Sequence, residues 1–308
     1  MPKPNDKIAE QLVILYKKSI ERLQKILIGL DASDIKNRRH YIAILKQIED
    51  EFREIDNHAA AWIKDNVSKS YQTGSAEGLR QLRELGITPT MTLFSKPHQQ
   101  MMKHVAEGFY YDFHKIVDQN KNSLITFIRR AHVGEAQQSE ILKAVGRGGI
   151  EGRVTKDVTA DILKALQTSL IDNRIVAGSK SYKASTYAEM LARTHLRVAF
   201  TRGTTMRLSE HGVDLVQVSA HGTVCPNCEE FENKVFSISG SSDVYPPLDL
   251  LPNGGTPFHP YCLHVLSGFI EALKDKSEIK EAQWIDVKDA KVSRIDLDVL
   301  HKWRKLAA

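Results

Sequence analysis

The chain has little of what marks secreted or membrane-spanning proteins. It contains only three cysteines among 308 residues, and so small and odd a number does not make a disulfide scaffold. No apolar run reaches the roughly 18 residues that a membrane-spanning helix needs. The first residues, Met-Pro-Lys-Pro-Asn-Asp, do not form a secretory signal. We therefore expect a soluble protein that starts in a cytoplasm.

Several enzyme signatures are also absent. The sequence has no Gly-rich nucleotide loop, no His-Glu-x-x-His and no Gly-x-Ser-x-Gly. The net charge of +5 is mild, so it permits contact with nucleic acid without requiring it. With 42% hydrophobic residues the chain can bury a core, and its length favours two domains over one.

The first half of the chain has helical periodicity. Apolar residues recur every three or four positions over 6–30 and again over 41–74. Shorter helices are expected over 75–85, closed by Gly86, and then over 96–117 and 123–130. Long helical hairpins usually belong to assemblies, because a neighbouring subunit then covers the apolar surface that the monomer leaves bare.

The middle of the chain is less regular. Residues 135–145 and 158–170 are expected to form short helices. Four glycines lie within 146–152, but this stretch lacks the lysine and the preceding strand of a nucleotide loop, so we interpret it as a turn or hinge. Residues 178–183 are interpreted as a loop that precedes a second domain.

The second domain is expected to begin with a helix and to continue with strands. Thr186 and Glu189 have the spacing of a capping box at a helix start. The cations that follow are suited either to nucleic acid or an acidic partner, or to a solvated helix surface; they are Arg193, Arg197, Arg202 and Arg207. Residues 213–218 and 234–238 alternate as half-buried strands do. The tail is expected to form a helix over 271–280, a strand over 284–287 and an amphipathic turn over 297–305.

The three cysteines share one short stretch with three histidines. Cys225 and Cys228 form a Cys-x-x-Cys pair, and His259 and Cys262 follow after a loop rich in Pro and Gly. Two such pairs can complete a tetrahedron around one metal ion. The spacing predicts structural Zn²⁺ bound by Cys225, Cys228, His259 and Cys262, with His264 as a substitute ligand, and a closed set of four leaves no position for a catalytic water.

A metal cross-link would also explain how this region folds. Two short strands with irregular loops have little core of their own, and structural zinc contributes roughly 10–16 kcal/mol of apparent free energy in small modules. His221, four residues before Cys225, is predicted to support the ligands or anchor the loop.

Three other interpretations compete with the structural zinc site. The cysteines are small apolar residues that a core can bury. A Cys-Pro-x-Cys pair is also found in disulfide oxidoreductases, but there a helix begins at once within a βαβ framework, and 229–233 is too short for that helix. The main enzyme alternative is a zinc-stapled nuclease of the His-Asn-His type, whose candidate residues are His221, Asn227, His259 and His264.

The order of motifs over residues 186–270 resembles the phage Mu F-like head morphogenesis and minor capsid proteins. The resemblance depends on Ala192-Arg193-Thr194, Val218-Ser219-Ala220-His221, Cys225-x-x-Cys228, Lys234-Val235-Phe236-Ser237, Tyr245-Pro246-Pro247 and His259-Pro260-x-Cys262. Where that family commonly has Arg after the last cysteine, this chain has Leu263.

The resemblance implies a low-copy virion component that acts in head assembly near the portal or the capsid interior. It implies the portal or the major capsid protein as partners, phage DNA as a further contact of the basic residues, no membrane, no established catalytic activity, and a location in the virion after assembly in the host cytoplasm.

Taken together, these patterns predict an α+β fold that is mostly α. An extended helical region is expected over 1–184, a Mu F-like minor head domain with its zinc-stapled loops over 185–275, and a tail over 276–308.

Overall fold

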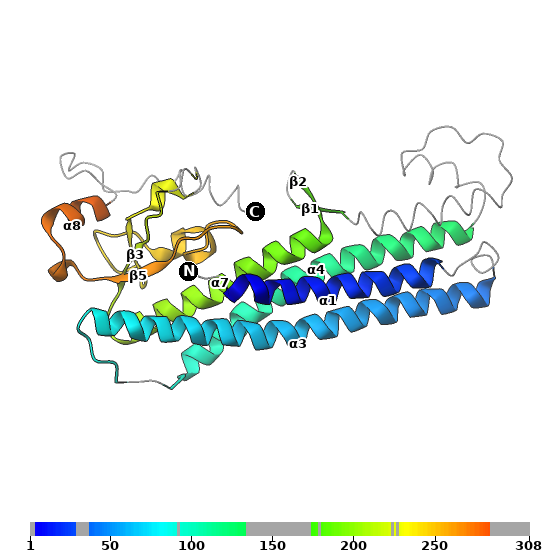
Figure 1. Cartoon of the computed structure of the whole chain (residues 1–308), viewed down its shortest axis with the longest axis horizontal. Coiled ribbons are helices and arrows are strands. Elements are labelled where there is room, and N and C mark those ends of the chain that lie inside the picture. Colours follow the sequence, from blue (N-terminus) through cyan, green and yellow to red (C-terminus); the bar gives the residue numbers. More distant parts are fainter. Residues whose placement is uncertain are drawn as a thin grey trace. The chain divides into compact units, whose positions relative to one another are not determined.

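The computed structural model describes residues 4–28, 37–90, 93–133, 174–177, 180–222, 225 and 228–283 (Figure 1). Its long helices are α1 (Pro4–Ile28), α3 (Arg38–Glu84), α4 (Lys96–Val133) and α7 (Ala184–Glu210). Its strands are β1 (Arg174–Ala177), β2 (Lys180–Lys183), β3 (Leu215–Val218), β4 (Val235–Ser237) and β5 (Leu266–Phe269), and α8 (Lys276–Ala282) follows. The fold is α+β and mostly α, as predicted. The features expected at 135–145, 146–152, 158–170, 284–287 and 297–305 lie outside the described residues.

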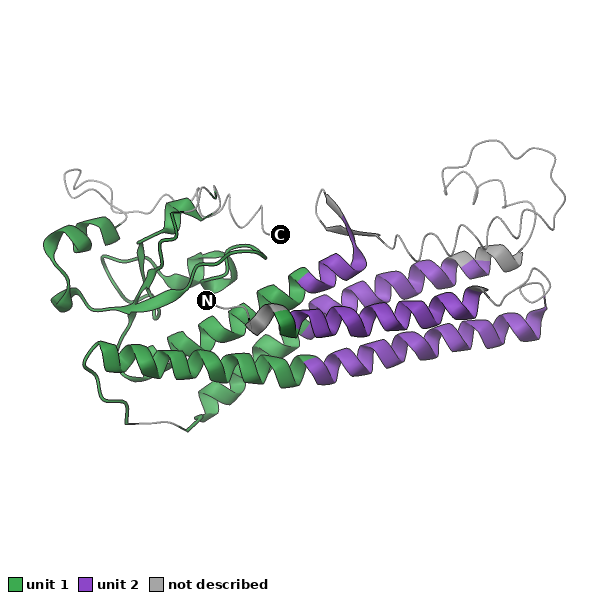
Figure 2. Ribbon diagram, in the orientation of Figure 1, with its two compact units in different colours: residues 1–8, 63–109, 190–308 green, residues 9–62, 110–189 purple. Residues whose placement is uncertain are grey.

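The chain divides into two compact units (Figure 2). Unit 1 contains residues 1–8, 63–109 and 190–308, and unit 2 contains residues 9–62 and 110–189. Each unit therefore combines segments that are distant in sequence. None of the described helices combines the length and hydrophobicity that a bilayer crossing requires.

Two predicted helix boundaries do not exist. Helix α3 continues through Gly74, where the sequence suggested a break, and α4 continues through the polar stretch at 118–122. Gly74 serves close helix packing instead, because a Cβ there would lie 1.9 Å from the carbonyl oxygen of Phe200 in α7. In α4, the side-chain amide of Asn120 is buried and donates to the Tyr16 hydroxyl, so a polar residue is accommodated within the helix.

Unit 2 is built from the apolar faces of three helices. The buried residues of this unit include Leu12, Tyr16, Leu23 and Leu27 of α1, Ile44, Ile48, Phe52 and Ile55 of α3, and Phe113, Ile116, Leu124 and Ile128 of α4. Beside this core, Asp56 of α3 accepts a hydrogen bond from the Tyr110 hydroxyl at 2.5 Å and lies 2.7 Å from His114 Nδ1. The bond to Asp56 raises the pKa of Tyr110 to about 12.

The small sheet of unit 1 is antiparallel, with β3 between β4 and β5. Leu215 pairs with Ser237 on one side and with Phe269 on the other. Strand β5 was not predicted, because Leu266-Ser267-Gly268-Phe269 does not alternate between apolar and polar residues. Tertiary contacts support it: Gln81 of α3 donates to the Leu266 carbonyl at 3.2 Å and accepts from the Gly268 amide at 3.0 Å. We call residues 213–283 the β-lobe.

A buried arginine holds unit 1 together at the end of α7. Arg207 is fully buried. Its guanidinium donates to Ser75 Oγ at 2.6 Å, to Glu210 at 2.9 Å and to the Leu93 carbonyl at 3.2 Å, and it lies 5.1 Å from the centre of the Phe94 ring. This side chain therefore joins α3, the segment before α4 and α7.

His98 extends the same polar network. Its ring is fully buried, and its Nδ1 lies 2.7 Å from the Tyr71 hydroxyl. Its Nε2 lies 2.8 Å from a Glu210 oxygen, a distance typical of an ion pair. Ser95 donates to the second oxygen of Glu210 at 3.1 Å. Glu210 thus connects the first turn of α4 with the last turn of α7.

Arg207→Met is expected to destabilise the protein by about 3 kcal/mol. Met keeps the volume of the side chain but removes its charge and all its hydrogen-bond donors, so Glu210 and the Ser75 hydroxyl lose a buried partner. Urea denaturation followed by circular dichroism measures the change. Arg83→Met is the control, since Arg83 is exposed, and is expected to change stability by less than about 0.5 kcal/mol. Equal effects of the two substitutions would show that the buried network contributes nothing.

Candidate metal centre

The Cys-x-x-Cys pair lies on a tight turn between β3 and β4. The amides of Cys228 and Glu229 both donate to the Cys225 carbonyl, at 2.9 and 3.0 Å. Cys228 is the residue before a single turn of 3-10 helix, η2 (Glu229–Phe231). These two hydrogen bonds bring Cys228 back toward Cys225, so the side chains of the two cysteines point to the same side of the turn.

A second turn supplies the other donors. The Cys262 amide donates to the His259 carbonyl at 2.9 Å, which brings these two side chains to one side of the chain, and His264 follows just before β5. This turn comes after two short 3-10 helices, η3 (Leu248–Leu250) and η4 (Pro252–Gly254).

The five predicted donors lie close together. His259 Nε2 is 3.1 Å from Cys228 Sγ and 3.4 Å from Cys225 Sγ. Cys228 Sγ is 4.0 Å from Cys262 Sγ, which is 3.5 Å from His264 Nδ1. They form two overlapping groups, Cys225 with Cys228 and His259, and Cys228 with Cys262 and His264, and within each group the donor atoms lie within 4.8 Å of one another. Cys228 belongs to both groups.

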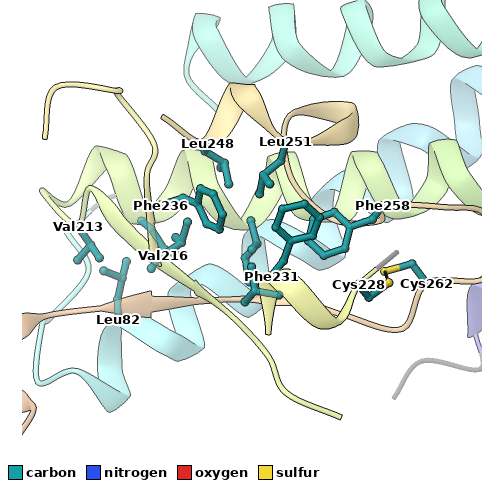
Figure 3. Packing of buried hydrophobic residues seen from close by; sticks show 13 residues of the cluster. Leu82, Val213, Val216, Cys228, Phe231, Phe236, Leu248, Leu251, Phe258 and Cys262 are labelled. Atoms are coloured by element: carbon teal, nitrogen blue, oxygen red, sulfur yellow. Dashed lines mark hydrogen bonds between the residues drawn. The ribbon is translucent and has the colours of Figure 1, made fainter. Parts of the chain in front are cut away.

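The cysteines are part of the hydrophobic core of the β-lobe. Cys228 and Cys262 are each 1% exposed, and Figure 3 shows their sulfur atoms close together beside the rings of Phe231 and Phe258. The two rings are 4.8 Å apart. The cluster as a whole contains Leu82, Leu208, Val213, Val216, Val218, Cys228, Phe231, Phe236, Leu248, Leu251, Phe258, Cys262 and Leu266. A bond between the sulfurs and a metal would therefore be a cross-link inside the core.

Burial shifts the pKa of two of these donors, Cys228 and His259. Burial, followed by the neighbouring Cys262, raises the pKa of the Cys228 thiol. Burial also lowers the pKa of His259, and His264 and Arg197 lower it further. A neutral imidazole has a lone pair for a metal, and a cation among three thiols is what favours their deprotonation.

The donor set fits zinc. Sulfur and imidazole nitrogen are the donors that tetrahedral Zn²⁺ sites use, and Zn–S bonds of about 2.3 Å place the sulfurs of a regular tetrahedron about 3.8 Å apart. The separation of 4.0 Å between Cys228 Sγ and Cys262 Sγ is close to that value. The cysteines are free thiols, none of them in a disulfide.

Comparison with known proteins identifies the family. The model of a family described as phage minor capsid protein 2 matches residues 46–296. The chain belongs to this family. The match covers most of the chain and confirms the predicted resemblance to phage minor capsid proteins. No curated protein and no solved structure matches the chain.

The matched range contains every candidate ligand of this minor capsid protein. It includes the β-lobe, most of α3 and all of α4 and α7. Asn227, on which the His-Asn-His nuclease alternative depends, lies outside the described residues. His221 lies 3.0 Å from Ser219 Oγ through its Nε2, and its backbone amide donates to Glu232.

The framework around the cysteines is not that of a disulfide oxidoreductase. The sheet beside Cys225 and Cys228 is antiparallel, and the helix that follows Cys228 has three residues. A redox Cys-x-x-Cys pair needs a helix start within a βαβ framework to stabilise its thiolate. The described residues therefore favour metal binding over redox chemistry for this pair.

The basic residues of α7 are largely occupied within unit 1. Arg207 is buried, as described above. Arg202 donates to the Asn253 carbonyl at 3.2 Å, and burial lowers its pKa. The guanidinium of Arg193 lies 5.6 Å from the centre of the Tyr261 ring. Both interpretations of these cations, a contact with nucleic acid or an acidic partner and a solvated surface, are therefore wrong for Arg207. The periodicity of charge along a helix does not reveal which side of the helix packs.

Glu232 is the residue near the site that sequence reasoning missed. Its Oε1 lies 2.8 Å from His264 Nε2, and this contact lowers the pKa of the carboxyl. Among three glutamates in the segment after Cys228, nothing in the spacing distinguishes the one that reaches His264, so no sequence signal was available.

Proposed function

We propose that this minor capsid protein acts in assembly of the phage head, near the portal or the capsid interior, and that a structural zinc ion holds its β-lobe together. The observation that carries the proposal is the family match, because it spans 46–296 and so includes most of α3, all of α4 and α7, and the cysteine cluster. The proposed function rests on the family, and the proposed zinc site rests on the set of donor residues.

The zinc is proposed to be bound by Cys225, Cys228 and Cys262 together with one histidine, His259 or His264. Four such ligands fill all the positions of tetrahedral zinc, so the ion would be structural. Bound there, it would supply charge for three thiolates and a cross-link between two loops that have little regular structure. The protein's own part is to hold both turns by backbone hydrogen bonds.

The partners are proposed to be other head proteins, the portal or the major capsid protein. Unit 2 leaves large apolar side chains exposed on three helices, namely Ile14 of α1, Ile42 of α3 and Tyr111 of α4. Single exposed apolar residues are common, but a subunit of an assembly has neighbours to cover them. DNA is a secondary proposal, because Arg207 and Arg202 are engaged in the protein.

Deleting the gene from the phage or prophage that encodes it, and supplying the chain in trans, tests the proposed role. Without it we expect aberrant or empty heads beside normal tails in electron micrographs, and a loss of infectious titre of at least about tenfold. The wild-type chain should restore the titre, and Cys228→Ser should not, because Cys228 belongs to both donor groups.

Cross-linking of purified particles followed by mass spectrometry then identifies the neighbour. Links to the portal or to the major capsid protein would support the proposed location. Normal heads and full titre in the deletion strain, or particles that never contain the chain, would overturn the assembly role while leaving the metal site to be tested separately.

A further inference from the structure

Two histidines of the proposed zinc site are candidates for one coordination position. Three cysteines leave a single place in a tetrahedral set, yet both His259 and His264 bring a ring nitrogen to the sulfur cluster. We infer that His264 is the fourth ligand and binds through Nδ1, and that Glu232 is the positioning residue that holds its ring for this purpose. The inference rests on the proposed zinc site and specifies its ligands.

The hydrogen bond to Glu232 determines which nitrogen of His264 is available. An ionised carboxylate only accepts hydrogen bonds, so Nε2, 2.8 Å from Glu232 Oε1, carries the hydrogen. In a neutral ring Nδ1 then has the free lone pair, and this atom lies 3.5 Å from Cys262 Sγ. A carboxylate that accepts from the far nitrogen of a ligating histidine is the usual support for such a ligand.

Glu232 is itself held in place. It comes directly after η2 and donates its amide to the Glu229 carbonyl at 3.3 Å, so its position is linked to the turn that carries Cys228. Its carboxylate also accepts from the backbone amide of His221 at 3.1 Å. One glutamate therefore connects the strand exit before Cys225, the turn after Cys228 and His264.

The ring of His264 has little freedom to turn away. The residue is 4% exposed. The ring of His221 meets it edge to face at 4.9 Å, and the ring of Phe258 lies at 5.9 Å. Together with the bond to Glu232, these contacts orient Nδ1 toward the sulfurs before any metal binds. Such preorganisation favours binding.

His259 has a different geometry. Its Nε2 lies between two sulfurs, 3.1 Å from Cys228 and 3.4 Å from Cys225, and the residue is only partly buried. These separations suit N–H···S hydrogen bonds. A zinc ion with three thiolates and one imidazole has a net charge of −1. A hydrogen bond donated to two of the thiolates lowers the free-energy cost of burying that charge. Among the described residues, no carboxylate holds the other nitrogen of His259 as Glu232 holds that of His264. His259 is therefore assigned as a donor to the sulfurs and not as the ligand.

Cobalt spectroscopy of the full chain tests the ligand assignment, because Co²⁺ replaces Zn²⁺ in tetrahedral sites and absorbs according to its thiolate count. In His264→Cys the charge-transfer absorption is expected to rise by about one third, since the number of thiolates goes from three to four. His259→Cys should leave the intensity at the wild-type level. The opposite pattern overturns the assignment.

Alanine variants provide a second test that does not depend on a new thiolate. Chelator competition on the zinc-loaded chain should show at least a 100-fold loss of affinity for His264→Ala and about a tenfold loss for His259→Ala, because only the first removes a ligand. If His259→Ala is the weaker binder, the assignment is wrong.

The role of Glu232 is tested by Glu232→Gln, with Glu230→Gln as the matched control, since Glu230 is exposed in the same turn. Glu232→Gln is expected to lower zinc affinity about 10- to 100-fold while the cobalt spectrum keeps its shape, because the four ligands remain. Equal affinities of the two variants would overturn the positioning role. If the wild-type chain binds no metal at a 1:1 ratio, the zinc site itself fails, which is a different result from a wrong choice of histidine.

Discussion

Removing the metal from the purified protein is expected to unfold the β-lobe while the helices of unit 2 stay folded. Structural zinc contributes on the order of 10 kcal/mol in small modules, and here its proposed ligands include two residues that are part of the core, Cys228 and Cys262. Without the ion, the cross-link between the two turns is lost and the cysteines remain as buried thiols. The three short strands then keep their hydrophobic cluster and the two hydrogen bonds of Gln81 to β5, but they lose the cross-link.

Hydrogen exchange with mass spectrometry measures this effect by segment. In chelator-treated protein, or in Cys262→Ser, peptides that cover β3, β4 and β5 should lose most of their protection, whereas peptides from α1 should keep theirs. Zn²⁺ should restore the protection of the chelated wild type, and Mg²⁺ should not. His58→Ala, an exposed histidine of α3 in unit 2, is the control and should behave as wild type. Full protection of the β-lobe without metal would contradict the structural role.

Gly203→Ala is expected to destabilise unit 1 by more than about 4 kcal/mol, which is exceptional for a single methyl group. A Cβ at this position of α7 would lie 2.2 Å from the Tyr71 carbonyl oxygen and 2.8 Å from the Ser75 amide nitrogen of α3. Both are backbone atoms within a helix, so neither can move aside without separating α3 from α7. Gly74→Ala should act similarly, because its Cβ would meet the Phe200 carbonyl.

The control for this prediction is Gly108→Ala in α4, where a Cβ has no heavy atom within 4 Å. Alanine is the better helix former by about 1 kcal/mol, so this substitution should stabilise the protein slightly. Denaturant unfolding of the three variants measures the difference. The two helix-contact glycines and the free one should therefore change stability in opposite directions. A gain of stability in Gly203→Ala would show that α3 and α7 do not approach as the structure describes.

The same close contact explains a difference between sequence and structure. Gly74 suggested the end of a helix, since glycine is a poor helix former. The structure keeps α3 helical and places α7 against it, with Thr204 Oγ1 donating to the Gly74 carbonyl at 3.0 Å and Ser70 Oγ donating to the Leu196 carbonyl at 2.6 Å. The glycine serves packing against a segment that is distant in the chain.

The sequence by itself determined the mostly helical class, the long helices near the start, the strands at 215–218 and 235–237, and the group of donors Cys225, Cys228, His259, Cys262 and His264. These features are local, because a helical period, a strand alternation and a Cys-x-x-Cys turn depend on residues a few positions apart. The family resemblance followed from the order of such motifs.

Only the tertiary structure decided the burial of Arg207, the continuity of α3 through Gly74, the pairing of β5, and the contact of Glu232 with His264. Each of these depends on residues that are far apart in the chain and meet only after packing. Periodicity identifies the side of a helix or strand that is apolar. It does not predict which backbone atoms, guanidinium or carboxylate will pack against that helix or strand. For that physical reason the donors could be predicted from spacing, whereas a choice between two histidines required the surroundings of each ring.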